Sequence, residues 1–197
     1  SITTTNNISP LSSLEKFVSS KCQKFIDTVH ILPFFPSSSD DGFAVKEYYN
    51  VDDEFGDWKD IINISKSFRV MADVVINHGS SEGVWFKNFI KGEGRGHDYF
   101  LSFDNTFDIT EVVRPRTSPL LNTFDTHDGT RYLWCTFSKD QVDYNFNNPK
   151  VINEFVEIIL YYLKMGITIF RFDAVAFLWK RIGTSCMNLE KTHEIIR

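Results

Sequence analysis

The chain has 197 residues, of which 42% are hydrophobic and 24% charged, the balance of a globular domain. Its net charge of -5 argues against nucleic acid or an anionic membrane surface as a partner, since both attract basic patches. No apolar run approaches the ~20 residues of a membrane span, and the polar stretch 1–9 lacks the apolar core of a signal peptide. The three cysteines suggest no disulfide framework, which fits a reducing cytoplasm best.

A helix and a strand are predicted near the N-terminus. Ser9 followed by Pro10 is typical of a helix start, and apolar residues then recur at three- and four-residue steps. We therefore expect a helix to about Ile26. The short apolar run 29–32 is closed by Pro33 and predicts a buried strand.

Two more helix–strand pairs follow. Asp57 is the expected cap of the next helix, and 70–76 is the next buried strand. The apolar residues of that helix are Trp58, Ile61, Ile62, Ile64 and Phe68. Asn148 is the expected start of a third helix that Gly166 ends, and the third strand covers 167–172.

This alternation of helices and strands predicts an α/β fold, because it is typical of βα units around a parallel sheet. The segment 79–147 is far longer than a βα loop of roughly 2–6 residues. It carries its own aromatic clusters, so we interpret it as a small inserted domain. The predicted organisation is a first segment at 1–78, the insertion at 79–147 and a second segment at 148–197.

Polar residues gather at the end of each predicted strand. The first group is 39–43, the second is 73–78 and the third is 171–174. The carboxyl ends of parallel strands are where α/β proteins place their sites. One such group is explained by helix capping, but three in succession favour a functional site.

The third group contains an arginine and an aspartate two residues apart. Side chains alternate along a strand, so Arg171 and Asp173 should share one face. The same alternation places Ile167 and Ile169 on that face as well. A neighbouring guanidinium lowers the pKa of a carboxyl group, which would keep Asp173 ionised, as a nucleophile must be. An interior ion pair without a catalytic role is the alternative.

The second group places an acid inside a strand. Asp73 should share a face with Asn77, and such a carboxylate needs a partner, for which Arg171 is a natural candidate. His78 is either a hydrogen-bond donor in the site or a structural histidine. The histidines and cysteines have no spacing typical of a metal site, so we predict none.

Two of these segments resemble family signatures. Residues 73–78, Asp-Val-Val-Ile-Asn-His, resemble the first signature of the α-amylase family of glycoside hydrolases. Residues 170–176, Phe-Arg-Phe-Asp-Ala-Val-Ala, resemble its second signature, which holds the nucleophile. Further segments are similar to the sucrose phosphorylase branch: 30–36, 39–43, 136–143 and 183–186. Residues 114–121 and 177–180 look closer to glucosylglycerate phosphorylase-like members.

The resemblance implies a partial (β/α)8 TIM barrel, covering about strands 2 to 4, with 79–147 as the family's inserted domain B. It also implies roles for single residues. Asp173 would be the nucleophile and Arg171 would orient it, while Asp73 and Asn77 would be structural supports. The residues that would bind substrate are Asp40, Phe43, His78, Phe137 and Gln141, the last near the acceptor or phosphate.

The function implied is retaining transfer of a glucosyl unit from sucrose or a related glucoside to inorganic phosphate, giving α-glucose 1-phosphate. No cofactor is expected beyond phosphate as co-substrate. A hydrolase or transglucosidase of the same family is the alternative, and so is a sugar-binding segment without catalysis. The acid/base glutamate and the third essential aspartate of the family lie on later strands. We therefore expect these 197 residues alone to be inactive.

Overall fold

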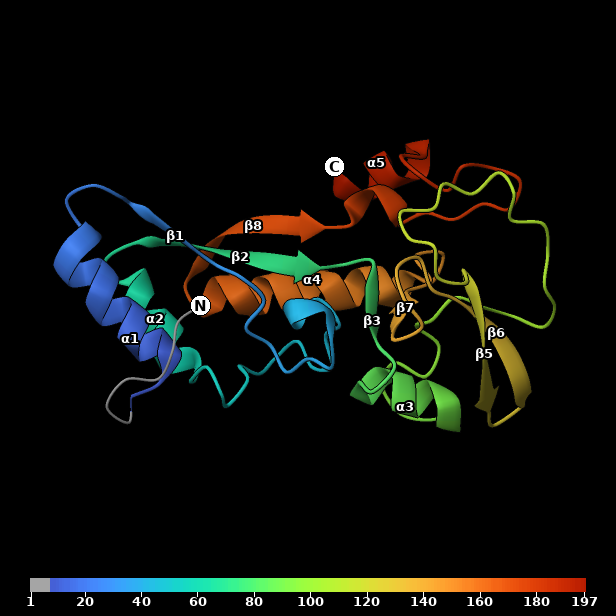
Figure 1. Cartoon of the computed structure of the whole chain (residues 1–197), viewed down its shortest axis with the longest axis horizontal. Helices are drawn as coiled ribbons and strands as arrows, with labels where there is room; N and C mark the ends of the chain where they lie inside the picture. Colours follow the sequence, from blue (N-terminus) through green and yellow to red (C-terminus); the bar gives the residue numbers. More distant parts are fainter. Residues whose placement is uncertain (1–7) are drawn as a thin grey trace.

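Three parallel strands form the centre of the computed structural model, which describes residues 8–197 (Figure 1). They are β1 (Thr28–Ile31), β2 (Arg69–Val75) and β8 (Ile167–Asp173), in the order β1-β2-β8. The predicted parallel α/β sheet is therefore confirmed. The first seven residues of the expected segment 1–78, and most of the polar stretch 1–9, lie outside the described residues.

The first helix is shorter than its apolar pattern predicted. Helix α1 covers Pro10–Phe17, with the Ser9 hydroxyl accepting the Ser12 amide, and it continues as the π-helix η1, Val18–Cys22. The prediction of a helix to Ile26 is wrong. Phe25, which fits the apolar spacing, is 84% exposed, so no core surface holds a further helical turn in place.

Two further helices, α2 and α4, pack beside the sheet (Figure 1). Helix α2 covers Trp58–Ser65 and begins with a capping box between Asp57 and Asp60. It ends three residues before Phe68, which is buried beyond the helix. Helix α4 covers Pro149–Lys164, is capped by Asn148 as predicted, and is followed by Gly166 at positive φ.

Strand β8 contains an irregularity that changes one predicted face. Its register with β2 shifts between the pairs Val70–Ile167 and Met71–Ile169, so Thr168 is an extra residue. Because paired residues of parallel strands share a face, Ile167 lies with Val70 on the face opposite to Ile169. The prediction that Ile167 shares the face of Asp173 is therefore wrong, since the bulge breaks the alternation. Beyond the bulge, Arg171 pairs with Asp73 and the expected alternation holds.

The long segment between β2 and α4 is folded into small elements. Strand β3 (His78–Ser80) pairs antiparallel with β7 (Gln141–Asp143). Between them lie α3 (Val84–Lys91) and a three-stranded sheet of β4 (Ser102–Phe103), β6 (Gly129–Trp134) and β5 (Leu121–Thr126). The chain then returns through α4 and β8 to η3 (Val175–Phe177) and α5 (Glu190–Ile196). The exact division at 79 and 147 remains a prediction.

This insertion is fastened to the barrel segment by a buried acid. Glu154 of α4 accepts from Arg95 through both carboxylate oxygens, at 2.8 and 2.7 Å, and from the Tyr99 hydroxyl at 2.8 Å. A bidentate pair of this kind fixes direction as well as distance. The insertion is therefore held beside the carboxyl ends of β2 and β8.

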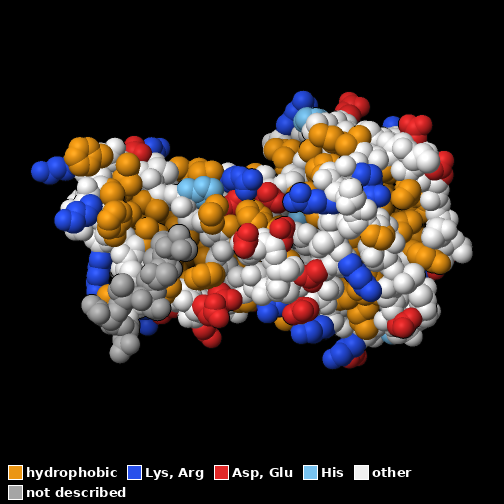
Figure 2. Space-filling model, viewed as in Figure 1, with side chains coloured by type: hydrophobic (Ala, Val, Ile, Leu, Met, Phe, Trp, Pro, Cys, Tyr) orange, Lys and Arg blue, Asp and Glu red, His pale blue; other side chains and the backbone are white. Residues whose placement is uncertain are grey.

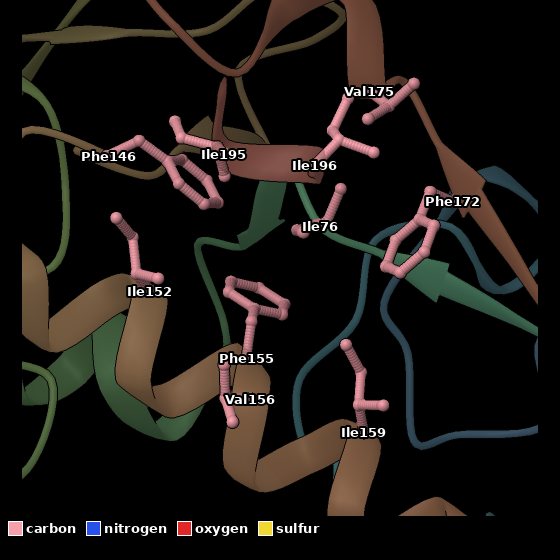
Figure 3. Close-up of a pocket in the computed structure, with 10 residues that line it drawn as sticks. All are labelled: Ile76, Phe146, Ile152, Phe155, Val156, Ile159, Phe172, Val175, Ile195 and Ile196. Carbon is pink, nitrogen blue, oxygen red and sulfur yellow. The ribbon is translucent and has the colours of Figure 1, made fainter. Parts of the chain in front are cut away.

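One cavity in the fold is entirely apolar. It measures about 160 Å³ and lies between α4, β8 and α5, whose side chains converge on it in Figure 3. Its lining residues include Phe155, Phe172 and Ile195. With no polar side chain among its lining residues, this cavity offers little to orient a polar ligand. Within residues 8–197, no helix is long and apolar enough to cross a membrane.

Candidate active site

A polar pocket of about 290 Å³ opens where the strands end against the insertion. Figure 2 shows acidic and basic side chains gathered together in this middle part of the surface. The structure brings six of the predicted site residues into the pocket wall: Asp40, Phe43, His78, Phe137, Gln141 and Asp173. They come from four separate segments of the chain, so the pocket depends on the tertiary fold.

Arg171 lies between two carboxylates. Its Nη1 donates to Oδ1 of Asp73 and lies 3.3 Å from Oδ1 of Asp173. Asp73 is fully buried, and its second oxygen accepts from His30 Nε2 at 2.8 Å. The predicted pairing of Asp73 with Arg171 is therefore confirmed. Asp73 joins the ends of all three strands, while Asp173 is a second and looser partner of the guanidinium.

The electrostatic balance at Asp173 differs from the one predicted. Burial raises the pKa of Asp173 above its ordinary value, and this effect outweighs the opposing influence of His78 and Arg171. The nearby carboxylate of Asp73 raises it further. The expectation of a lowered pKa is wrong, because Arg171 gives its closer hydrogen bond to Asp73 and Asp173 loses part of its hydration.

The loop after β1 carries Asp40 into the pocket. Asp40 and Asp41 both have positive φ, 56° and 50°, within the 3-10 turn η2 (Asp40–Gly42). Non-glycine residues adopt this conformation at a cost, which is common at functional sites. Gln141 Nε2 donates to Asp40 Oδ2 at 2.8 Å and fixes the carboxylate toward the insertion.

A second acid anchors the same loop. Asp140 accepts hydrogen bonds from the hydroxyls of Ser38, Ser39, Ser80 and Ser81. These bonds hold the pKa of Asp140 below its usual value despite the desolvation that raises it. Sequence reasoning gave Asp140 no role, although the serines around 38 and 80 were a possible signal.

His78 is buried at the base of the pocket, with 1% of its surface exposed. Its Nε2 lies 3.1 Å from the carbonyl oxygen of Phe43 and 3.2 Å from the side-chain nitrogen of Gln141. The ring also contacts Phe137 at a centroid distance of 5.0 Å. Burial lowers the pKa of His78, so the neutral ring is favoured.

A charged network behind His78 was missed from the sequence. Asp143 of β7 accepts from Asn77 Nδ2 at 2.9 Å and pairs with Lys180 Nζ at 2.7 Å. Lys180 also donates to Asn77 Oδ1 at 2.8 Å. Asn77 thus contacts both charged groups, and its role as a structural support stays a prediction. Lys180 lies seven residues after Asp173, in no strand pattern, so nothing in its spacing pointed to this contact.

Two further pocket residues were also missed as site residues. Asp41 follows Asp40 in the same turn, and Arg116 comes from the long loop before β5. Arg116 contributes a positively charged guanidinium group to the wall of this pocket. Its segment, Arg-Pro-Arg at 114–116, had been noted only as part of a resemblance. Among residues 8–197, no group of three or more histidine, cysteine or acidic side chains is placed to hold a metal ion.

Three parallel strands with a polar pocket at their carboxyl ends, overhung by an insertion after β2, define part of a (β/α)8 barrel. The chain belongs to the α-amylase family, because the family described as "Alpha amylase, catalytic domain" matches residues 24–195.

Several similar proteins of this family are phosphorylases. The chain is 43% identical over 188 residues to a glucosylglycerate phosphorylase of Spirochaeta thermophila, covering 95% of this chain and 32% of that protein. It is 44% identical to a glucosylglycerate phosphorylase of Escherichia coli, and the match covers 98% of this chain and 34% of that protein. The crystal structure of sucrose 6F-phosphate phosphorylase from Thermoanaerobacter thermosaccharolyticum superposes with a TM-score of 0.88 at 31% identity. The superposition covers 94% of this chain and 41% of that one. The chain spans about a third of the length of the curated relatives it matches.

Proposed function

We propose that the protein is a retaining α-glucoside phosphorylase, which transfers a glucosyl unit to inorganic phosphate and releases α-glucose 1-phosphate. The observation that carries this proposal is one pocket lined by both the Asp173 carboxylate and the Arg116 guanidinium. A carboxylate is suited to attack on a sugar, and a guanidinium is suited to bind a phosphate oxygen.

In the first step, a carboxylate oxygen of Asp173 attacks the anomeric carbon and forms a covalent glucosyl-enzyme. The bond to the leaving oxygen breaks as a carboxylic acid gives that oxygen a proton. In the second step, a phosphate oxygen attacks the same carbon and frees Asp173. Two inversions retain the α configuration, so the product is α-glucose 1-phosphate.

The pocket wall suits a glucosyl unit on chemical grounds. Asp40 and His78 provide polar atoms for hydroxyl groups, while Phe43 and Phe137 offer apolar ring surface for the C–H face of a sugar. Gln141 is committed to Asp40 and Ser138 through hydrogen bonds of 2.8 and 2.9 Å. We assign it to holding Asp40 and to the acceptor or phosphate side of the pocket.

The names of the relatives support phosphorolysis, since several are phosphorylases of glucosides. A hydrolase or transglucosidase of the same family is the alternative, favoured by the similarity to a trehalose synthase/amylase of Mycobacterium tuberculosis. We propose further that no cofactor beyond phosphate is used and that the protein works in the cytoplasm.

The test is product analysis with the protein made from its complete coding sequence. We would incubate it with glucosylglycerate or sucrose, with and without phosphate. Phosphate-dependent formation of α-glucose 1-phosphate is the expected result. Release of free glucose at the same rate with and without phosphate would contradict the proposal and favour the hydrolase.

A further inference from the structure

The carboxamide of Asn77 has only one orientation that satisfies its charged neighbours. Lys180 Nζ lies 2.8 Å from one end of the carboxamide, and Asp143 Oδ2 lies 2.9 Å from the other. An ammonium group has no acceptor and a carboxylate has no donor. The oxygen of Asn77 must therefore face Lys180, and its NH2 group must face Asp143.

This orientation determines what the NH2 group offers to His78. One hydrogen goes to Asp143, and the second is directed toward His78 Nδ1, which lies 3.3 Å from Asn77 Nδ2. His78 Nε2 also faces an NH2 group, that of Gln141 at 3.2 Å, but this amide donates to Asp40 and the same ring nitrogen faces the carbonyl oxygen of Phe43. A carbonyl oxygen can only accept, so the proton belongs on Nε2 and His78 Nδ1 is the acceptor. The ring proton is then on Nε2, where the carbonyl oxygen of Phe43 accepts it at 3.1 Å.

We propose that Lys180 is a positioning residue that fixes the ring tautomer of His78 through the carboxamide of Asn77. Lys180 lies beyond the nucleophile strand, and Asn77 lies between β2 and β3, so the network links the two strand ends that frame the pocket. This inference rests on the proposed function and deepens it, since it fixes the ring of a pocket residue by placing Nε2–H against the carbonyl oxygen of Phe43.

The charges around His78 agree with a neutral ring in this tautomer. Desolvation lowers the pKa of His78, and the ammonium of Lys180 lowers it further, whereas the carboxylates of Asp143 and Asp173 raise it. Lys180 itself is buried, with 5% of its side chain exposed, and its pairing with Asp143 offsets part of the cost of burying the charge.

The experiment records ¹⁵N NMR spectra of the histidine rings in the protein made from its complete coding sequence, at neutral pH. The signal of His78 is assigned by its loss in His78→Gln. We expect the wild-type ring to be neutral with its proton on Nε2. A ring protonated at Nδ1, or at both nitrogens, would overturn the proposal before any variant is made.

Lys180→Met then removes the cation that orients Asn77. We expect the His78 ring to lose its single tautomer and kcat/KM for phosphorolysis to fall about tenfold, the equivalent of one hydrogen bond. Lys180→Arg should restore the wild-type ring signal. Lys164→Met removes an exposed lysine at the end of α4 and should change neither measurement. A folded Lys180→Met protein with the wild-type ring signal would overturn the proposal.

Asn77→Asp provides a second variant in case Lys180→Met does not fold. A carboxylate cannot donate to Nδ1, so we expect this nitrogen to gain a proton, and an unchanged tautomer would contradict the inference. The NMR readout needs no turnover. A wild-type protein that shows the Nε2–H ring but forms no glucose 1-phosphate would therefore refute the proposed function while leaving the arrangement of the three side chains in place.

Discussion

Arg171 is bound more closely to Asp73 than to Asp173, whose carboxylate oxygen lies 3.3 Å from the same guanidinium nitrogen. Asp73 has no exposed surface, whereas the side chain of Arg171 is 45% exposed and reaches the pocket side of the sheet. The buried acid therefore fixes the guanidinium, and the guanidinium in turn faces the candidate nucleophile. Loss of either contact should affect stability and catalysis to different extents.

We expect Asp73→Asn to destabilise the protein by about 2–3 kcal/mol, because it breaks a buried ion pair and leaves Arg171 and His30 without their charged partner. Chemical denaturation measures the change. The matched control is Asp27→Asn at the other end of the same strands, where Asp27 pairs with Arg69 in solvent. That exposed pair should matter far less, so equal effects of the two variants would contradict the prediction.

The pH dependence of activity should reflect the raised pKa of Asp173. Because burial favours the protonated form, the carboxyl group remains neutral to a higher pH than an exposed aspartate does. The rate should rise with pH through this raised pKa, and over the same range the folded state should lose stability as a poorly hydrated charge forms. The acid limb of kcat/KM measures the pKa. Arg171→Met should move that limb to higher pH, since Arg171 lowers the pKa of Asp173.

The turn that carries Asp40 should depend on Gly42. Gly42 has a φ of 100°, and an added Cβ would lie 2.8 Å from Pro33 Cβ and 2.9 Å from its carbonyl oxygen. Gly42→Ala should weaken substrate binding as well as stability. Gly129 has a similar φ of 113° with nothing within 4 Å, so Gly129→Ala shows the backbone strain alone, on the order of 1 kcal/mol. Equal thermal shifts and unchanged KM values would argue against a role for this turn.

Arg116 should contribute more to the binding of phosphate than to the binding of the glucoside. Removal of a guanidinium that binds an anion costs roughly 10- to 100-fold in affinity, the equivalent of one charge-assisted hydrogen bond. We expect Arg116→Gln to raise the KM for phosphate by about this factor and to change the rate of glucosyl-enzyme formation much less. Arg181→Gln, which removes an exposed arginine outside the pocket wall, is the control. If Arg116→Gln left the KM for phosphate unchanged, the proposed role of Arg116 in phosphate binding would be wrong.

The three parallel strands could be predicted from local patterns, whereas most pocket residues were expected from the resemblance to the α-amylase family. Strands β1, β2 and β8 are short apolar runs with polar residues at their ends, and the pairing of Asp73 with Arg171 follows from an acid inside such a run. Helix caps such as Asn148 are likewise set by neighbouring residues.

Features that depend on distant contacts could not be predicted in this way. The bulge at Thr168 leaves no trace in the apolar pattern, and Phe25 continues a helical spacing without a surface to bury it. Lys180 contacts a residue 103 positions away, so its role depends on how the insertion folds back. The raised pKa of Asp173 reflects how far the folded chain removes water from its carboxyl group, which no local spacing encodes.

Mass spectrometry of a trapped glucosyl-enzyme tests the role of Asp173 most directly. A slowly turned-over fluorinated α-glucosyl donor would be added to the protein, and the modified peptide would then be sequenced. We predict one added sugar, attached to Asp173, and none in Asp173→Asn, whose turnover should fall on the order of 10⁴-fold or more. A sugar attached to Asp40 or Asp41, or full activity in Asp173→Asn, would contradict the assignment of the nucleophile.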